Sequence, residues 1–235
     1  MTTIGSNLQT VRDRIAAACA GAQRPVTDVT LLAVSKTFGP EAVREAHRCG
    51  QRAFGENYIQ EAVDKMALLA DLSLEWHCIG PVQSNKTRLV AQHFDWMHTV
   101  DRLKIAQRLA EQRPEGRAPL NVCIQVNIDG GVAKSGVAPA DALALARDVA
   151  QLPNLRLRGL MTIPEPAEGY EAQVAVHARA ATLFAQLRDA GLALDTLSMG
   201  MTGDLEAAVA AGSTMLRIGT AIFGGRARPA GPAHG

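Results

Sequence analysis

The chain has 235 residues, of which 47% are hydrophobic and only 4% aromatic, and its formal net charge is +1. This near-neutral charge excludes the strongly basic surface that is typical of nucleic-acid binders and of proteins held on anionic lipids. The length fits one large domain or two small ones, and no shift in composition divides the chain.

No apolar stretch reaches the roughly 20 residues that a membrane span needs, and the first six residues lack the pattern of a secretory signal. The four cysteines, at positions 19, 49, 78 and 123, form no C-x-x-C pair. This spacing favours free thiols in a reducing cytoplasm over a disulfide framework. The six histidines form no close cluster and no zinc-binding motif, so we expect no metal site.

Short apolar runs alternate with amphipathic segments eight times, after an additional helix that we expect over 7–20. The expected strands are 30–35, 53–57, 75–80, 96–100, 120–127, 155–163, 196–200 and 214–219. The expected helices between them include 40–49, 59–70, 102–112, 140–150, 171–190 and 205–211. Eight such units, in a chain near the typical length of about 250 residues for this fold, predict a single closed (β/α)₈ TIM barrel, here over 7–226. An open doubly wound sheet is the alternative, and residues 227–235 are expected to form a disordered tail.

Lys36 closes the first apolar run and has the same strand parity as Leu32 and Val34. In this barrel type, functional groups collect where strands end. A partly desolvated amine at that position has a lowered pKa and can form a Schiff base with a carbonyl. The alternative is an ordinary solvated lysine at a strand end.

Arg217 lies within the last apolar run, and a guanidinium is almost never buried without an acceptor. A ligand contact is therefore favoured over a structural ion pair. Gly219 and Thr220 follow at a turn that opens a short helix, which is suited to an anion. With the loop over 198–204, they match the usual phosphate site of the barrel. An amine and a phosphate site together predict a ligand that carries an aldehyde and a phosphate.

Other strand ends carry a polar group or a glycine that we expect at the same mouth: Asn57, Ser198 and Gly200. Met161 is expected to pack against a flat ligand. His77 is interpreted either as a hydrogen-bonded core histidine or as a ligand contact. Lys134 is either a surface lysine on a loop over the mouth or a second amine near the carbonyl.

Six segments resemble, in the same order, the pyridoxal phosphate homeostasis proteins, a single-domain family with the alanine racemase N-terminal barrel. These segments are AVSKT (33–37), FGENY (54–58), WHCIGPVQSNK (76–86), RGLM (158–161), LSMGM (197–201) and RIGTAIFG (217–224). The resemblance implies that Lys36 forms the internal aldimine with pyridoxal 5′-phosphate and that Arg217 faces the pyridine nitrogen. The cofactor-binding residues expected in all are Lys36, Asn57, Met161, Ser198, Gly200, Met201, Arg217, Gly219 and Thr220. The chain departs from the family at Thr202 and Ala133, where serine is usual.

The resemblance implies a protein that buffers pyridoxal phosphate and delivers it to apo-enzymes, in vitamin B6 homeostasis, with no catalytic residue of its own. A permanently charged arginine cannot take the ring proton, which weakens the cofactor as an electron sink. Racemisation needs a second acid or base on the opposite face of the substrate. The related racemases take a tyrosine for this from a further domain, whereas the tyrosines here are Tyr58 and Tyr170. An amino-acid racemase and a cofactor-free Schiff-base aldolase are the alternatives, and we expect a monomer.

Overall fold

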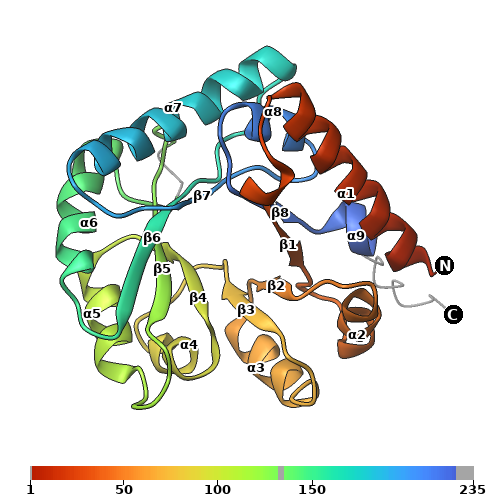
Figure 1. Ribbon diagram of the computed structural model, residues 1–235. Helices are drawn as coiled ribbons and strands as arrows, with labels where there is room; N and C mark the ends of the chain where they lie inside the picture. Colours follow the sequence, from red (N-terminus) through yellow and green to blue (C-terminus); the bar gives the residue numbers. More distant parts are fainter. Residues whose placement is uncertain (1, 132–134, 226–235) are drawn as a thin grey trace, which may run out of the picture.

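The computed structural model describes residues 2–131 and 135–225. Within these ranges, eight parallel strands close into a barrel in sequence order, and the helices surround it (Figure 1). The predicted (β/α)₈ barrel is confirmed, and the open sheet is excluded. Lys134 and the predicted tail over 227–235 lie outside the described residues.

The strands are β1 (Thr30–Val34), β2 (Ala53–Glu56), β3 (Glu75–Cys78), β4 (Trp96–Val100), β5 (Leu120–Gln125), β6 (Leu155–Met161), β7 (Thr196–Ser198) and β8 (Met215–Ile218). The helices are α1 (Thr3–Gly21), α2 (Pro40–Arg48), α3 (Ile59–Ala67), α4 (Thr87–His93), α5 (Leu103–Gln112), α6 (Ala142–Ala150), α7 (Tyr170–Asp189), α8 (Leu205–Ala210) and α9 (Thr220–Phe223). Short 3₁₀ turns cover Val26–Asp28 and Pro139–Asp141. All strands but β4 end one or two residues before the predicted boundary, so the residues at those positions belong to the loops at the mouth.

Two helix starts differ from the sequence-based expectation by two residues or more. Helix α1 begins at Thr3 instead of residue 7, because the Thr2 hydroxyl accepts a hydrogen bond from the Gly5 amide at 3.2 Å and caps the first turn. Helix α6 begins at Ala142, after the 3₁₀ turn. The predicted start of α1 was wrong because a side-chain cap decides it, and that of α6 because its first turn is 3₁₀.

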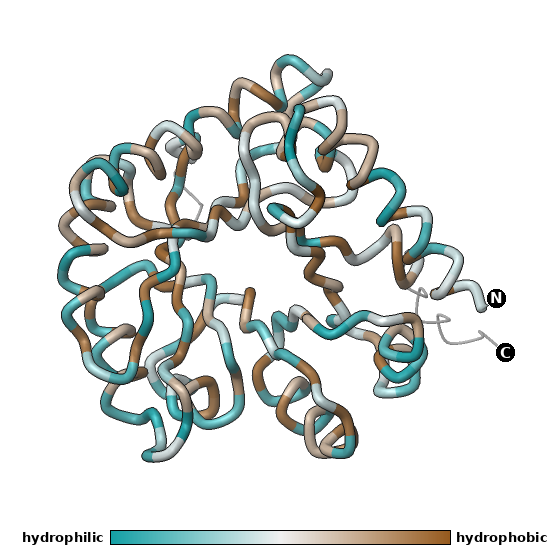
Figure 2. Tube along the Cα trace, viewed as in Figure 1, coloured by the Kyte–Doolittle hydropathy of each residue, from teal (hydrophilic) through white to brown (hydrophobic). Residues whose placement is uncertain are grey.

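Apolar residues form two separate layers. The larger core lies between the strands and the surrounding helices. A smaller cluster fills the barrel interior and consists of Leu32, Val34, Ala53, Ile79, Trp96, Cys123, Met161 and Met215. Figure 2 shows the hydrophobic segments along the strands and alternating colours along the outer helices. Burial of both layers supplies the main stabilisation of the barrel, at about 25 cal/mol per Å² of apolar surface.

Helix α1 packs against α8 and α9, where the barrel closes between β8 and β1 (Figure 1). The Arg14 guanidinium binds the Glu206 carboxylate at 2.8 Å and donates to the Thr202 carbonyl at 3.1 Å. The Asn7 amide donates to the Ile222 carbonyl at 2.9 Å. One helix therefore anchors both the loop after β7 and the short helix after β8.

The four cysteines are free thiols. Burial raises the pKa of Cys78 and of Cys123 to about 12, so neither thiol is a nucleophile near neutral pH. Over 2–131 and 135–225, no helix is both long and apolar enough to cross a bilayer. The same residues contain no group of three or more side chains arranged to hold a metal ion.

Candidate functional site

A cavity of about 330 Å³ lies at the carboxyl ends of the strands, within the size range of small-molecule sites. Its lining comes from the ends of six strands and the loops that follow them. The lining residues are Val34, Lys36, Asn57, Ile79, Ile163, Met201, Thr202, Gly203, Arg217, Gly219 and Thr220. Residues from both ends of the chain thus meet at one mouth, as the barrel topology requires.

Most of the site residues predicted from the sequence line this cavity, namely Lys36, Asn57, Met201, Arg217, Gly219 and Thr220. Three others lie beneath or behind its lining. Met161 is fully buried in the interior cluster, Ser198 is buried as a hydrogen-bond partner of Arg217, and Gly200 supports the loop after β7. Five lining residues were not among the predicted binding residues, namely Val34, Ile79, Ile163, Thr202 and Gly203, although the loop over 198–204 was singled out as a whole.

Lys36 occupies the turn directly after β1, and a buried ion pair fixes the backbone beneath it. The Lys65 ammonium, from α3, donates to the Ser35 carbonyl at 3.0 Å and to the Glu56 carboxylate at 2.6 Å. The Ser35 hydroxyl donates to the same carboxylate at 2.6 Å. Burial raises the pKa of the Glu56 carboxyl, and the Lys65 charge opposes that shift. These contacts hold the position from which the Lys36 side chain enters the cavity.

Arg217 extends from β8 into the barrel interior and is 4% exposed. Its guanidinium donates to the Ser198 hydroxyl and to the Thr162 carbonyl, both at 2.8 Å. Both partners are neutral, and no carboxylate of the described residues forms an ion pair with it. Burial lowers its pKa to about 10, which still leaves the group charged near neutral pH. The cavity therefore has a buried positive charge with no carboxylate in direct contact, although the Asp204 carboxylate acts on it from a distance.

The loops after β7 and β8 bring two hydroxyl groups together at one end of the cavity. The Thr220 hydroxyl donates to the Thr202 hydroxyl at 3.2 Å. Gly200, with φ +93°, makes the turn that leads into the first loop. A Cβ at that position would lie 2.4 Å from the Ala208 Cβ, so only glycine fits.

Asp204 stabilises the same loop through hydrogen bonds. Its carboxylate accepts hydrogen bonds from the Met201 amide at 2.7 Å and from the His177 ring at 2.9 Å. Burial raises the pKa of Asp204, but these hydrogen bonds outweigh it and the pKa lies below its ordinary value. The charged carboxylate thus fixes the loop backbone next to Thr202 and Gly203.

The donors in the cavity suit a flat, anionic, carbonyl-bearing ligand. The buried Asn57 Oδ1 has no hydrogen-bond partner among the described residues, so an acceptor atom is left for a ligand donor. Arg217 supplies a buried charge, the threonines supply hydroxyl groups, and Lys36 supplies a primary amine. Val34, Ile79 and Ile163 provide apolar contact area. This set fits pyridoxal phosphate, which has an aldehyde, a ring nitrogen, a phenolic hydroxyl and a phosphate.

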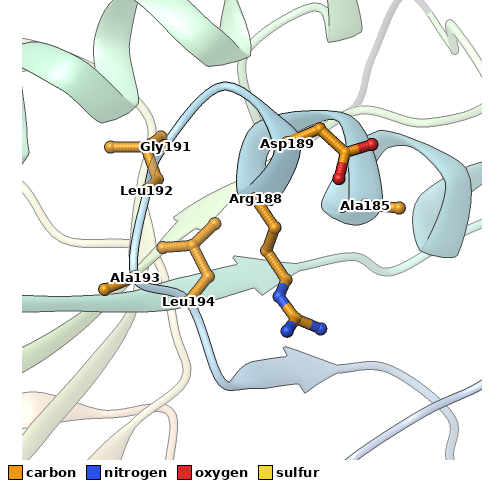
Figure 3. A pocket seen from close by; sticks show the side chains of 7 residues that line it. All are labelled: Ala185, Arg188, Asp189, Gly191, Leu192, Ala193 and Leu194. Atoms are coloured by element: carbon orange, nitrogen blue, oxygen red, sulfur yellow. The ribbon is translucent and has the colours of Figure 1, made fainter.

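A second hollow of about 500 Å³ lies at the opposite end of the barrel, where α7 leads into β7 (Figure 3). Its charged side chains, Arg188 and Asp189, point in different directions, and the loop that follows α7 contributes Leu192 and Leu194 to its lining. Without converging polar groups, and at the amino ends of the strands, it lacks the features of a site in this fold.

Comparison with known proteins gives consistent results. Residues 6–227 match the family described as the alanine racemase N-terminal domain. The pyridoxal phosphate homeostasis protein of Pseudomonas aeruginosa is 61% identical over 226 residues, which are 96% of this chain and 97% of that protein. Its counterpart in Escherichia coli K12 is 56% identical over 229 residues, 96% and 98% of the two chains. PipY of Synechococcus elongatus, solved with pyridoxal phosphate bound, is 42% identical with a TM-score of 0.82, over 94% of this chain and 100% of PipY.

Proposed function

The chain belongs to the alanine racemase N-terminal domain family and, within it, to the pyridoxal phosphate homeostasis proteins, and we propose that it binds pyridoxal phosphate and passes it to other proteins. The observation that carries this proposal is the cavity in which Lys36, the buried Arg217 and two threonine hydroxyl groups converge. The relatives' names and the bound cofactor of PipY support the same ligand.

In this proposal, each part of the cavity binds one part of the cofactor. Lys36 holds the aldehyde carbon as a Schiff base, and Arg217 donates a hydrogen bond to the ring nitrogen. Thr202, Gly203 and Thr220 bind the phosphate. When bound, the cofactor supplies an electron-accepting ring. Because Arg217 cannot accept a proton, it keeps the ring nitrogen unprotonated, which limits that capacity.

The cavity is better suited to binding than to racemisation. Lys36 and Arg217 are the only ionisable residues that line the cavity within the described part of the chain, and an arginine does not exchange its proton as an acid or base. Racemisation requires a second acid or base on the other face of the substrate. We therefore propose a carrier in preference to an amino-acid racemase or an aldolase.

The first experiment identifies the ligand and the amine. The purified protein is incubated with pyridoxal phosphate, its absorbance spectrum is recorded, and borohydride reduction is followed by peptide mass mapping. We expect a coloured protein whose reduced adduct lies on Lys36, and loss of colour in Lys36→Ala. The matched control is Lys104→Ala, at an exposed position of α5, which should retain both the colour and the adduct.

Two results would contradict the assignment. A colourless wild-type protein would exclude pyridoxal phosphate as the ligand. An adduct on another lysine, Lys134 included, would move the covalent site.

Delivery is tested separately from binding. The loaded protein is mixed with a pyridoxal-dependent apo-enzyme, in the presence of a phosphatase that destroys free cofactor. We expect the apo-enzyme to regain activity faster than with the same amount of free cofactor. Deuterium exchange at the α-carbon of added amino acids, at a useful turnover, would favour the racemase instead.

A further inference from the structure

A line of polar side chains, buried except at its first member, runs through the barrel interior from its amino end to Arg217. The Glu75 carboxylate, on the first residue of β3, lies 2.8 Å from His77 Nε2. His77 Nδ1 lies 2.9 Å from His98 Nε2, and His98 Nδ1 lies 3.0 Å from the Ser198 hydroxyl. Ser198 in turn accepts from Arg217 at 2.8 Å. We call Glu75, His77, His98 and Ser198 the axial network.

The environment keeps both imidazoles neutral. His77, His98 and Ser198 are each 1% exposed or less, whereas the Glu75 side chain is 48% exposed at the barrel's amino end. Burial lowers the pKa of His77, and the hydrogen bond to Glu75 offsets only part of this shift. Burial lowers the pKa of His98 well below 6.5, and the neighbouring His77 and Arg217 lower it further. Hydrogen bonding to His77 lowers the pKa of Glu75, so its carboxylate is charged.

With neutral imidazoles, only one arrangement of protons satisfies every contact. A charged carboxylate only accepts, so His77 carries its proton on Nε2 and its Nδ1 is an acceptor. His98 must then donate from Nε2, which leaves its Nδ1 to accept from the Ser198 hydroxyl. Ser198 accepts from Arg217, which can only donate. Every donor in the axial network therefore points away from Arg217 and toward Glu75.

Flanking contacts restrict the rings further. The His77 ring stacks on Trp96, with centroids 5.1 Å apart and planes 10° apart. The Arg158 guanidinium in turn lies over the Trp96 ring, 4.5 Å from its centroid. The imidazole of His77 thus has little freedom to rotate out of line.

We propose that Glu75, His77 and His98 are positioning residues for Arg217, because they fix the Ser198 hydroxyl as an acceptor and so orient the guanidinium toward the ligand. This inference rests on the proposed function for the ligand's identity. The carboxylate at one end of the barrel sets the orientation of a ligand-binding group at the other. None of the three touches the cavity, so each acts through Ser198.

The proton arrangement is tested without any cofactor, by nitrogen-15 NMR of the histidine side chains near neutral pH. We expect both His77 and His98 to be neutral, with the proton on Nε2. In Glu75→Leu, which removes the acceptor, His77 and His98 should show a mixture of tautomers. Glu75→Gln should restore the single tautomer, because its amide oxygen can still accept. Glu111→Leu, at an exposed position of α5, is the matched control and should leave the spectra unchanged.

The link to Arg217 is tested by a double-mutant cycle on the affinity for pyridoxal phosphate. Glu75→Leu should weaken binding by about threefold to tenfold, and Glu75→Gln by less than about twofold, as expected for the loss of one oriented hydrogen bond. In a Ser198→Ala background, Glu75→Leu should have no further effect, because the path to Arg217 is already interrupted.

Two results would overturn the inference: a His98 proton on Nδ1 in the wild-type protein, or an effect of Glu75→Leu that is equal in both backgrounds. A wild-type protein that binds no pyridoxal phosphate would instead refute the proposed function, while the NMR tautomers would still stand or fall on their own.

Discussion

Lys65 and Arg217 are two buried cations that the protein compensates in different ways. Lys65 is 5% exposed and lies 2.6 Å from the Glu56 carboxylate, between α3 and the barrel wall. Arg217 is 4% exposed but contacts a hydroxyl group and a backbone carbonyl instead. The first charge is neutralised within the fold, and the second is left for an anionic or acceptor ligand.

This difference separates a structural ion pair from a binding group. A buried charge without a counter-ion lowers stability, so it persists where something else compensates for it. Burial alone does not distinguish the two cations, and neither does their position near the mouth. Their hydrogen-bond partners do.

The largest effect on stability is expected at the Lys65–Glu56 ion pair. Lys65→Met should lower the free energy of unfolding by about 3–5 kcal/mol, because it leaves the Glu56 carboxyl buried with only the Ser35 hydroxyl as partner. Chemical denaturation measures the loss. The double variant Lys65→Met with Glu56→Gln should recover part of it, since both charges are then absent. Equal stability of Lys65→Met and wild type would show that the pair contributes nothing.

The second-largest expected effect is a pH dependence of the free energy of unfolding, caused by the histidines of the axial network. The pKa of His77 and of His98 is lower in the folded protein than the unfolded value of 6.5. The unfolded state therefore binds more protons below this pH, and stability present above 6.5 is lost as the pH falls toward the folded values. The expected slope is up to about 1.4 kcal/mol per pH unit for each histidine.

Denaturation at a series of pH values checks this slope. His98→Asn should flatten it, whereas His93→Gln, at an exposed histidine, should leave it unchanged. A wild-type profile that is already flat below pH 6.5 would show that the buried histidines are charged in the folded protein.

The smallest effect on stability is expected at Arg217, which has no carboxylate in direct contact. Arg217→Met should change the free energy of unfolding by less than about 1 kcal/mol, because the lost hydrogen bonds are offset by removal of a buried charge. The affinity of the Arg217→Met variant for pyridoxal phosphate should fall by about tenfold or more, as expected for loss of a charged hydrogen bond. Destabilisation as large as that of Lys65→Met would remove the contrast between the two cations.

The sequence was sufficient for the barrel because each strand–helix unit repeats the same apolar pattern. Strand starts such as Thr30 and Leu120 were predicted correctly, but the strand from Leu120 was extended to 127. Val126 continues the extended backbone and pairs with Val137, so its apolar character gave no sign that the ladder ends at Gln125.

Cavity-lining residues were predictable where their position along a single strand is enough to place them at the mouth, as for Lys36 and Arg217. The axial network was not, although His77 was considered as a hydrogen-bonded core histidine. His98 gave no signal of its own, because its role depends on the register between β3 and β4, which pairs His77 with Trp96. Register and side-chain contacts across the barrel are three-dimensional facts that alternation along one strand does not contain.

The contacts of α1 with the loops after β7 and β8 have a consequence for the order of folding. The Asn7–Ile222 and Arg14–Thr202 hydrogen bonds join residues that are 215 and 188 positions apart in the sequence. Contacts between such distant positions carry a large loop-closure cost and form late, so the loops that line the cavity reach their final positions only when the ring of strands closes.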